Sequence, residues 1–325
     1  TARIGISNEN QGAQNIGDVN GDGYDDLEIT DINGIRYFVY GGDRQAAVNV
    51  SQLSTPGNSF GFIIAATGAS MEPTRGGDIN GDGLSDILVG DGSGNNNYVI
   101  FGSTRSIGQV NLAALGTNGF KFTSTSAIHE PSVVGDVNGD GYEDMLFNNS
   151  SNFHNYLVFG GTNFTPGGSV ALPTALGTGT LATGTGTGTS YVSITNGGSY
   201  NSGGTISTLH GDFNGDGYSD FALAQMPTTG IGTGPVYVYY GSASPTAWNS
   251  NNLTLAGNGR GFRITGLTGS NSQKFESTNM GDINGDGMDD IVFNDGDQRA
   301  FVLFGKTDST SVSTADLTAG IGGFI

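Results

Sequence analysis

The chain contains no cysteine and only 11 lysines and arginines among its 325 residues. Without cysteine, neither a disulfide framework nor a thiolate metal site can form. No apolar run approaches the roughly 20 residues of a membrane-spanning helix. The few basic residues and the formal net charge of −19 argue against nucleic acid or an anionic membrane surface as the partner.

Helix-forming stretches rich in lysine, glutamate and leucine are also missing. Apolar residues make up 35% of the chain and charged residues 13%, whereas glycine occurs 58 times. This composition predicts an all-β protein with many turns. The length suits one large domain built from repeats or two ordinary domains.

A nine-residue acidic loop occurs five times, and its copies begin at Asp18, Asp78, Asp136, Asp212 and Asp282. Every copy has aspartate at positions 1, 5 and 9, asparagine at position 3, and glycine at positions 4 and 6. In a tight loop of this spacing, the oxygens at positions 1, 3 and 5 point inward and glycine at position 6 permits the sharp turn. Position 7 can offer its backbone carbonyl, and the aspartate at position 9 closes the shell. The pattern therefore predicts about five Ca²⁺ ions, one in each loop.

The predicted calcium ligands, loop by loop, are Asp18, Asn20, Asp22, Tyr24 and Asp26; Asp78, Asn80, Asp82, Leu84 and Asp86; Asp136, Asn138, Asp140, Tyr142 and Asp144; Asp212, Asn214, Asp216, Tyr218 and Asp220; and Asp282, Asn284, Asp286, Met288 and Asp290. Position 12 is apolar in every copy, so the loop lacks the glutamate of an EF-hand, and short apolar runs of strand type follow it.

Clusters of aspartate, asparagine and glycine also occur in ordinary turns. Five copies with the same oxygen donors favour a metal site instead, because carboxylates so close together repel one another without a cation. The five loops hold 18 of the 30 acidic residues, so most of the acidity belongs to the predicted metal sites.

Two strand signatures accompany the loops. The first is an aromatic and β-branched run that ends in glycine, at residues 37–41, 98–102, 156–160, 237–241 and 301–305. The second begins with Gly-Phe, at 61–64, 119–122, 261–264 and 323–325. The strand before each loop is less regular.

The loops are spaced 60, 58, 76 and 70 residues apart, which is the period of a four-stranded propeller blade or a comparable β array. We therefore predict a single β-propeller domain over residues 1–325, with units of about 1–60, 61–118, 119–190, 191–260 and 261–325. Residues 1–4 and 323–325 lie at the same phase of the repeat. Three arrangements fit this phase. The five blades could close a ring, the chain could be a piece of a longer array, or the spare strand could pair with another copy.

Residues 160–209 interrupt the pattern with a tract of alternating glycine and threonine. The extra length is too short for a hidden blade, so we expect an enlarged surface loop or an extended edge strand. An adhesive or partner-binding loop is the alternative.

Together, the Asp-x-Asn-x-Asp-Gly-x-x-Asp loops, the Tyr-Val-x-Phe-Gly strands and the Gly-Phe-x-Ile strands resemble FG-GAP repeats. These form the blades of the N-terminal propeller of integrin α subunits and of many bacterial secreted proteins. The resemblance implies calcium held between the first two strands of each blade, and extracellular adhesion or recognition. Integrin-like propellers usually have seven blades, whereas only five units are visible here.

The sequence gives no support for catalysis. No Gly-x-Ser-x-Gly motif occurs, there is no cysteine nucleophile, and the three histidines lie at different phases of the repeat without metal-ligand spacing. Most aspartate pairs are assigned to calcium, and a liganded carboxylate is a poor proton donor.

The only tryptophan, Trp248, could serve as a platform for a sugar ring. It lies five residues before Leu253, however, as Val110 lies before Leu115 and Val312 before Leu317. Because this is a repeated apolar position, packing in the core is the preferred interpretation.

We expect a secreted or cell-surface protein that acts in adhesion or self-assembly. Extracellular calcium modules typically have dissociation constants of about 10⁻⁴–10⁻³ M, which suits that location. The expected partners are other copies of the protein or an extracellular ligand such as a glycan, and a homo-oligomer is one expected form. The alternatives are a lectin-like carbohydrate-binding module and an accessory domain of a secreted polysaccharide-degrading enzyme.

Overall fold

The structure is a computed structural model, and it describes residues 12–30, 35–43, 48–64, 73–74, 76–90, 95–105, 107–125, 128–149, 154–172, 178–181, 189–195, 209–224, 234–245, 248–249, 259–267, 277–294 and 299–325. The described part consists of β-strands with two 3₁₀ turns and one short α-helix, which confirms the predicted all-β class. The chain divides into two compact units. The first comprises 1–133, 160–173 and 180–189, and the second comprises 134–159, 174–179 and 190–325.

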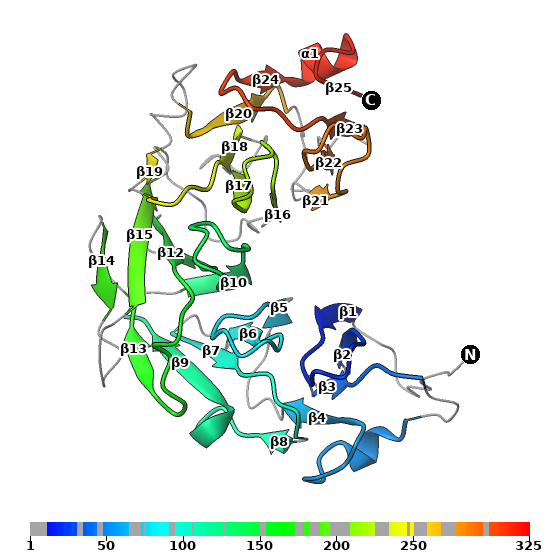
Figure 1. Cartoon of the computed structure of the whole chain (residues 1–325), viewed down its shortest axis with the longest axis vertical. Helices are drawn as coiled ribbons and strands as arrows, with labels where there is room; N and C mark the ends of the chain where they lie inside the picture. The colour runs from blue at the N-terminus through cyan, green and yellow to red at the C-terminus, as the bar shows by residue number, and fades with distance from the viewer. Residues whose placement is uncertain are drawn as a thin grey trace. The chain divides into compact units, whose positions relative to one another are not determined.

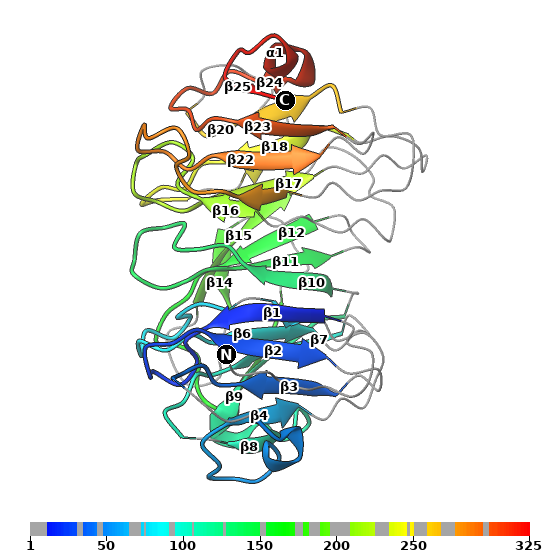
Figure 2. The same ribbon diagram turned by 90° about the vertical axis from the view of Figure 1, so that its right-hand side faces the viewer.

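The first unit contains two sheets, which we number 1 and 2 by their acidic loops. Sheet 1 has the order β1-β2-β3-β4-β8, with strands β1 (Gly12–Gly17), β2 (Asp26–Thr30), β3 (Arg36–Val39), β4 (Gly61–Ile64) and β8 (Gly108–Val110). Sheet 2 has the order β5-β6-β7-β9-β13, with β5 (Pro73–Thr74), β6 (Ile87–Gly90), β7 (Asn96–Ile100), β9 (Gly119–Thr123) and β13 (Ser169–Ala171). The 3₁₀ turns η1 (Val50–Gln52) and η2 (Gly116–Asn118) and strand β10 (Ile128–Val133) also belong to this unit. Figure 2 shows β1 to β4 side by side.

The second unit contains sheets 3, 4 and 5. In sheet 3, β12 (His154–Val158) pairs with β11 (Met145–Asn149) and β15 (Thr189–Thr195), and β19 (Trp248–Asn249) pairs with β15. Sheet 4 has the order β16-β17-β18-β20-β24, with β16 (Leu209–Gly211), β17 (Asp220–Ala224), β18 (Val236–Tyr239), β20 (Gly261–Thr265) and β24 (Val312–Ser313). Sheet 5 has the order β21-β22-β23-β25, with β21 (Ser277–Asn279), β22 (Ile291–Asn294), β23 (Ala300–Leu303) and β25 (Gly323–Phe324). The remaining elements are β14 (Thr178–Leu181) and helix α1 (Thr314–Thr318).

A strand from the following repeat completes four of the sheets. Strand β8 lies between β7 and β9 in the chain, yet it pairs in parallel with β4 of sheet 1, and β24 likewise pairs with β20 (Figure 1). Strands β13 and β19 add in the same way to β9 and β15. In this register Trp248 lies opposite Ile194, as Val110 lies opposite Ile64. The backbone of Trp248 thus occupies the repeated position, while its side chain lies outside the described part of the structure.

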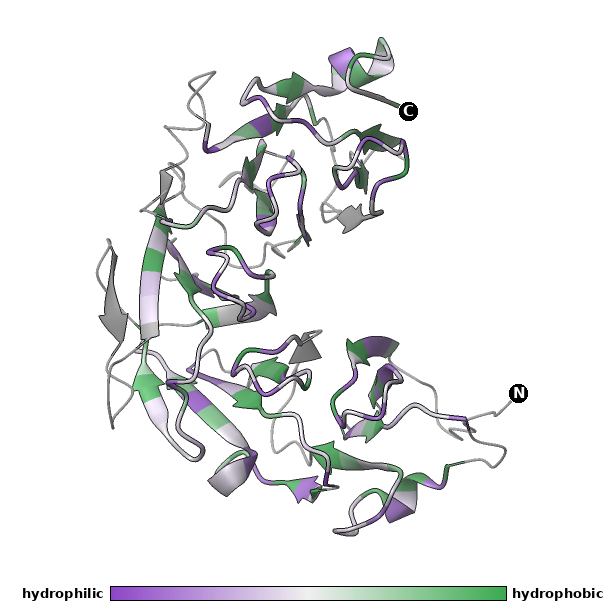
Figure 3. Cartoon of the chain, in the orientation of Figure 1, coloured by the Kyte–Doolittle hydropathy of each residue, from purple (hydrophilic) through white to green (hydrophobic). Residues whose placement is uncertain are grey.

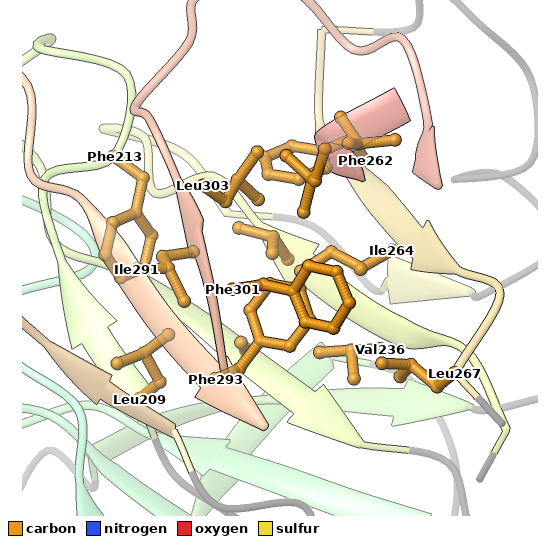
Figure 4. Packing of buried hydrophobic residues seen from close by; sticks show 14 of the residues in the cluster. Leu209, Phe213, Val236, Phe262, Ile264, Leu267, Ile291, Phe293, Phe301 and Leu303 are labelled. Atoms are coloured by element: carbon orange, nitrogen blue, oxygen red, sulfur yellow. The ribbon is translucent and has the colours of Figure 1, made fainter. Parts of the chain in front are cut away.

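The hydrophobic core lies between neighbouring sheets of one unit. In the first unit, Val19 and Phe62 of sheet 1 belong to one buried cluster with Ile87 and Tyr98 of sheet 2. Figure 4 shows the equivalent cluster in the second unit, where side chains of β20 and β18 pack against those of β22 and β23. The strands carry most of the apolar residues and the acidic loops carry polar ones (Figure 3). Within each unit, neighbouring sheets therefore bury apolar residues against each other.

The segment 160–209, predicted as an enlarged loop or an edge-strand extension, contains strands β13, β14 and β15 in its described part. Strand β15 pairs antiparallel with β12, so it takes the place of the Gly-Phe strand in sheet 3. It also crosses the predicted unit boundary at residue 190. The rest of the glycine and threonine tract lies outside the described residues. Within those residues, no helix is long and apolar enough to span a membrane.

Candidate metal-binding loops

The first acidic loop folds around the carboxylate of its first residue. Oδ1 of Asp18 accepts hydrogen bonds from the N–H of Gly21 at 2.7 Å and of Asp22 at 3.2 Å, and Oδ2 accepts from the N–H of Gly23 at 2.8 Å. Gly21 and Gly23 have φ angles of 76° and 87°, which glycine adopts without the strain of a side chain. The two glycines thus let successive N–H groups turn toward one aspartate.

Positions 3 and 5 continue the same turn. Oδ1 of Asn20 accepts from the N–H of Asp22 at 2.9 Å, and the Asn20 side-chain amide donates to Oδ2 of Asp22 at 3.0 Å. Oδ1 of Asp22 accepts from the N–H of Tyr24 at 3.0 Å. These bonds bring the side chains of positions 1, 3 and 5 into one small turn.

All five loops repeat this geometry. The bond from the position-4 N–H to the position-1 carboxylate measures 2.6–2.7 Å in every loop. The bond from the position-6 N–H measures 2.8–2.9 Å. The position-6 glycines have φ angles of 85–89°. A sequence pattern that is the same in five places therefore gives the same local structure in five places.

The aspartate at position 9 is fully buried in every loop: Asp26, Asp86, Asp144, Asp220 and Asp290 each have 0% exposure. One oxygen accepts from the N–H of position 2 at 2.8–3.0 Å. In loops 1, 2, 4 and 5 the other oxygen accepts from the N–H of the glycine that ends the aromatic strand, at 2.6–2.9 Å. Position 9 therefore ties the loop to the third strand of its sheet. The sequence offered a signal for this role, because that glycine recurs in every unit.

Three of the buried position-9 carboxyls, those of Asp26, Asp86 and Asp220, are costly to ionise. Burial raises the pKa of Asp26 to about 6, and repulsion from Asp22 and Asp18 adds to the rise, while the two backbone N–H bonds oppose it. Burial also raises the pKa of Asp86 and of Asp220 to about 8. A cation beside these groups would favour their charged form.

At the exposed position 1 of loop 5 the shift is reversed, since the N–H bond from Gly287 holds the pKa of the Asp282 carboxyl below its usual range. Asp282 at position 1 of loop 5 and the position-9 aspartates of loops 1, 2 and 4 thus have opposite environments. Backbone donors favour the charge of Asp282, and burial opposes the charge of Asp26, Asp86 and Asp220.

The donor set of each loop fits a hard cation in chemical type. It contains carboxylate and amide oxygens only, and a carboxylate oxygen that accepts one hydrogen bond keeps a further lone pair. Among the described residues, however, no group of three or more His, Cys, Asp or Glu side chains is placed to hold a metal ion. The structure brings positions 1, 3 and 5 together and directs position 9 to backbone N–H groups. A bound Ca²⁺ would be held by the oxygens of positions 1, 3 and 5, with position 9 and the position-7 carbonyl as the further predicted ligands.

Neighbouring loops are joined by backbone hydrogen bonds that the sequence did not reveal. In the first unit, the carbonyl of Asp18 accepts from the N–H of Ser85 at 2.9 Å, and the carbonyl of Val19 accepts from that of Ser103 at 2.8 Å. The second unit repeats the pair twice at 2.8–2.9 Å, with acceptors Asp136, Val137, Asp212 and Phe213 and donors Ser219, Ser242, Asp289 and Lys306. Positions 1 and 2 of a loop thus bind position 8 and the strand end of the next repeat. Main-chain bonds of this kind leave no residue preference to detect.

Position 7 also reaches the preceding loop. A methyl group on Gly21 would lie 2.7 Å from Cδ2 of Leu84, and one on Gly139 would lie 2.4 Å from Cε1 of Tyr218. The position-4 glycine therefore leaves room for the position-7 side chain of the next repeat. The sequence assigned position 7 only to a backbone carbonyl.

The chain was compared with known proteins. No curated protein matches it. The solved structures similar to it include two crystal structures titled BBS1N in complex with ARL6DN. One, soaked with mercury, has 12% identity to this chain and a TM-score of 0.37. The match covers 96% of this chain and 83% of the chain in that structure. The other, soaked with lead, has 10% identity, a TM-score of 0.35, and coverage of 94% and 81%.

The model of the FG-GAP-like repeat family matches residues 78–147. The matched segment begins at the first aspartate of loop 2 and ends just after loop 3, so it spans one full period of the repeat. Residues 78–147 therefore carry an FG-GAP-like repeat.

Proposed function

We propose that this chain is an extracellular, calcium-stabilised β-propeller with FG-GAP-type blades, and that it acts by binding, in cell-surface adhesion or self-assembly. The observation that carries the proposal is the fivefold recurrence of one loop geometry with an all-oxygen donor set. Calcium in this role is structural. It neutralises the crowded carboxylates and rigidifies each loop, and so couples the stability of the fold to the ion.

The joints between loops explain why calcium would matter beyond each loop. Position 1 is a predicted calcium ligand and position 2 is the residue next to it. The backbone carbonyls of both positions also accept the hydrogen bonds from the next repeat. A cation that fixes the loop backbone therefore fixes the joint as well. Loss of the ion would loosen both the loop and its contact with the next repeat.

The first test is calcium binding by calorimetry, with thermal unfolding in millimolar calcium and in EDTA. We expect about five bound ions and a lower melting temperature in EDTA, because ligand at 100 times its dissociation constant stabilises by about 2.7 kcal/mol for each site. Asp18→Ala should remove one ion. Asp43→Ala, an exposed acidic position outside the loops, should remove none. Unchanged melting in EDTA, or no bound calcium, would show that the loops are turns without a metal function.

Size-exclusion chromatography with light scattering, run on the same samples, tests the second half of the proposal. Assemblies in calcium that dissociate in EDTA are the expected result. A monomer at every protein concentration would contradict self-assembly. Such a monomer, if it bound members of a glycan array, would instead support the lectin-like alternative.

A further inference from the structure

Positions 3 and 4 of every acidic loop form an Asn-Gly dipeptide, and four further Asn-Gly pairs lie elsewhere in the chain. The loop pairs begin at Asn20, Asn80, Asn138, Asn214 and Asn284. In an Asn-Gly pair the glycine nitrogen can attack the asparagine side-chain amide, because no Cβ on the glycine hinders the approach. Aspartate would offer calcium the same kind of oxygen ligand at position 3. Asparagine in all five loops therefore adds a reactive bond that calcium binding alone does not require.

The fourth loop shows how the structure places the asparagine amide. Oδ1 of Asn214 accepts a hydrogen bond from the N–H of Asp216 at 2.9 Å. A bond from a side chain to the backbone two residues on is an Asx turn, and it folds the amide of Asn214 toward the nitrogen of Gly215 between them. The N–H of Asp216 also points at the oxygen that gains charge when the amide carbon is attacked.

The attacking nitrogen is held in the same turn. The N–H of Gly215 donates to Oδ1 of Asp212 at 2.7 Å, so a carboxylate lies where the proton of this N–H has to leave. Gly215 has a φ angle of 75°, which glycine adopts without strain. One turn thus brings together a nucleophile, an electrophile and the groups that assist both.

All five loops hold these groups in the same way. The N–H of position 4 lies 2.6–2.7 Å from the carboxylate of position 1. The N–H of position 5 lies 2.9–3.0 Å from Oδ1 of the asparagine. The asparagine nitrogen donates to the position-5 carboxylate at 2.9–3.1 Å. Gly139 and Gly215, at position 4 of loops 3 and 4, are exposed, so water reaches the reacting bond.

One Asn-Gly pair outside the loops has a different setting. Asn118 ends the 3₁₀ turn η2, and Gly119 begins strand β9, where it is buried and pairs with Ile100. A methyl group on Gly119 would lie 2.1 Å from the carbonyl oxygen of Val99. The N–H of Phe101 binds the carbonyl of Asn118 at 2.9 Å. A backbone fixed on a sheet in this way cannot make the movement that ring closure needs, so this pair is an internal control.

We propose that the Asn-Gly bond of each acidic loop is a site of spontaneous modification, at which the asparagine deamidates when the loop holds no calcium. The backbone nitrogen of position 4 forms a bond to Cγ of the asparagine. The bond from Cγ to the side-chain nitrogen breaks, and this nitrogen leaves as ammonia with the proton lost from position 4. One water then opens the resulting succinimide ring, which gives aspartate or isoaspartate.

The calcium dependence of this inference rests on the proposed function of the loops. Oδ1 of position 3 and the carboxylate of position 1 are both predicted calcium ligands. An asparagine held by the ion cannot turn onto the position-4 nitrogen, and the ion competes with the position-4 N–H for the same carboxylate. Bound calcium therefore protects the bond, and its loss exposes the bond to reaction.

The two products change a loop in different ways. Aspartate at position 3 adds a carboxylate to the donor set, and the number of charged ligands tunes the calcium affinity of such loops. Isoaspartate adds a carbon atom to the main chain and so alters the spacing between positions 1 and 5. A loop that has lost its ion is thus altered permanently, toward tighter calcium binding or toward none.

Peptide mapping by mass spectrometry tests the proposal on the intact chain. The protein is kept at neutral pH in millimolar calcium or in EDTA, and circular dichroism confirms that it stays folded. In EDTA we expect the loop asparagines to react roughly tenfold faster than Asn118, because the turn holds the reacting groups together. In calcium the rates at the loops should fall to that of Asn118. Equal rates at the loops and at Asn118 in EDTA would overturn the proposal.

Asn214→Gln and Asn214→Asp are the matched variants. Glutamine keeps an amide oxygen but would have to close a larger ring, so loop 4 should stop reacting while the other loops continue. Continued reaction of loop 4 at its original rate would rule out the ring mechanism. Asn214→Asp represents the aspartate product, and its fourth loop should bind calcium several-fold more tightly. Weaker binding would refute that consequence.

Calorimetry on the same samples separates this inference from the proposed function. If calcium binds and the loops react as fast in calcium as in EDTA, protection by the ion is refuted while the calcium sites stand. If no calcium binds and the loops still react faster than Asn118, the calcium role fails while the modification sites stand.

Discussion

Sheets 4 and 5 are built from the same strand signatures, yet they differ sharply in what they bury. Phe262 pairs with Val238 in sheet 4, and Phe324 pairs with Val302 in sheet 5, in the same register. The first is 1% exposed and the second 48% exposed. Local structure is therefore set inside each repeat, whereas burial depends on the neighbouring sheet, as Phe262 packs against side chains of sheet 5. A single repeat of this kind therefore needs a neighbouring repeat to complete its hydrophobic core.

Sheet 1 differs from sheet 5 in how much of its apolar surface the chain itself covers. Ile29, Val39 and Leu53 form a buried cluster of their own, with Val48 and Phe60 packed against it. The chain that follows β3 thus covers much of the face that an inner repeat would turn to its predecessor. Leu27 remains outside this cover. Sheet 1 therefore buries most of this face with its own chain, whereas Phe324 of sheet 5 is 48% exposed.

Replacing the same phenylalanine in sheets 4 and 5 gives the largest expected contrast. Phe262→Ala should lower stability by about 3–5 kcal/mol, because it removes a fully buried ring from a packed cluster. Phe324→Ala should cost about 1 kcal/mol or less, since half of the ring is already in water. The midpoints of urea unfolding measure both. Equal losses would mean that the fifth repeat is covered in solution.

The position-4 glycines allow a finer comparison. Gly139 and Gly285 have φ angles of 74° and 79°, so Gly→Ala pays a similar backbone cost of about 1–2 kcal/mol at both sites. Only at Gly139 would the new methyl group also meet the ring of Tyr218. Gly139→Ala should therefore cost about 1–3 kcal/mol more than Gly285→Ala.

The difference between the two glycine variants, rather than either value alone, is the test, and urea midpoints measured in calcium report it. If the two variants were equally destabilised, the position-7 contact would not contribute to the joint.

The sequence predicted what is local. The five loops adopt one geometry, and the aromatic runs at 37–41 and 98–102 supply strands β3 and β7, because glycine placement and β-branched residues act within a few positions. Calcium ligation by these loops stays a prediction. The link from position 9 to the strand-ending glycine was missed, although both residues recur in every unit.

What the sequence could not predict is long-range pairing through the backbone. Strands β8 and β19 are two or three residues long, and strand β15 lacks the Gly-Phe signature of its counterparts. Such short segments carry no periodicity to read. Their partners are chosen by register and by the neighbouring sheet, which depend on the assembled fold.

Capping residues at the two ends of the array give the smallest expected effect and the strictest control. Oδ1 of Asn49 accepts from the N–H of Ser51 at 3.0 Å at the start of η1, and Oγ of Ser313 accepts from the N–H of Asp316 at 3.1 Å at the start of α1. Both bonds close within one turn, so neither depends on a neighbouring repeat. Asn49→Ala and Ser313→Ala should each cost about 1 kcal/mol, with equal shifts of the urea midpoint within error. A much larger loss from Ser313→Ala would show that α1 itself supports sheet 5, and the contrast between sheets 4 and 5 would then need a cause besides the packing of neighbouring sheets.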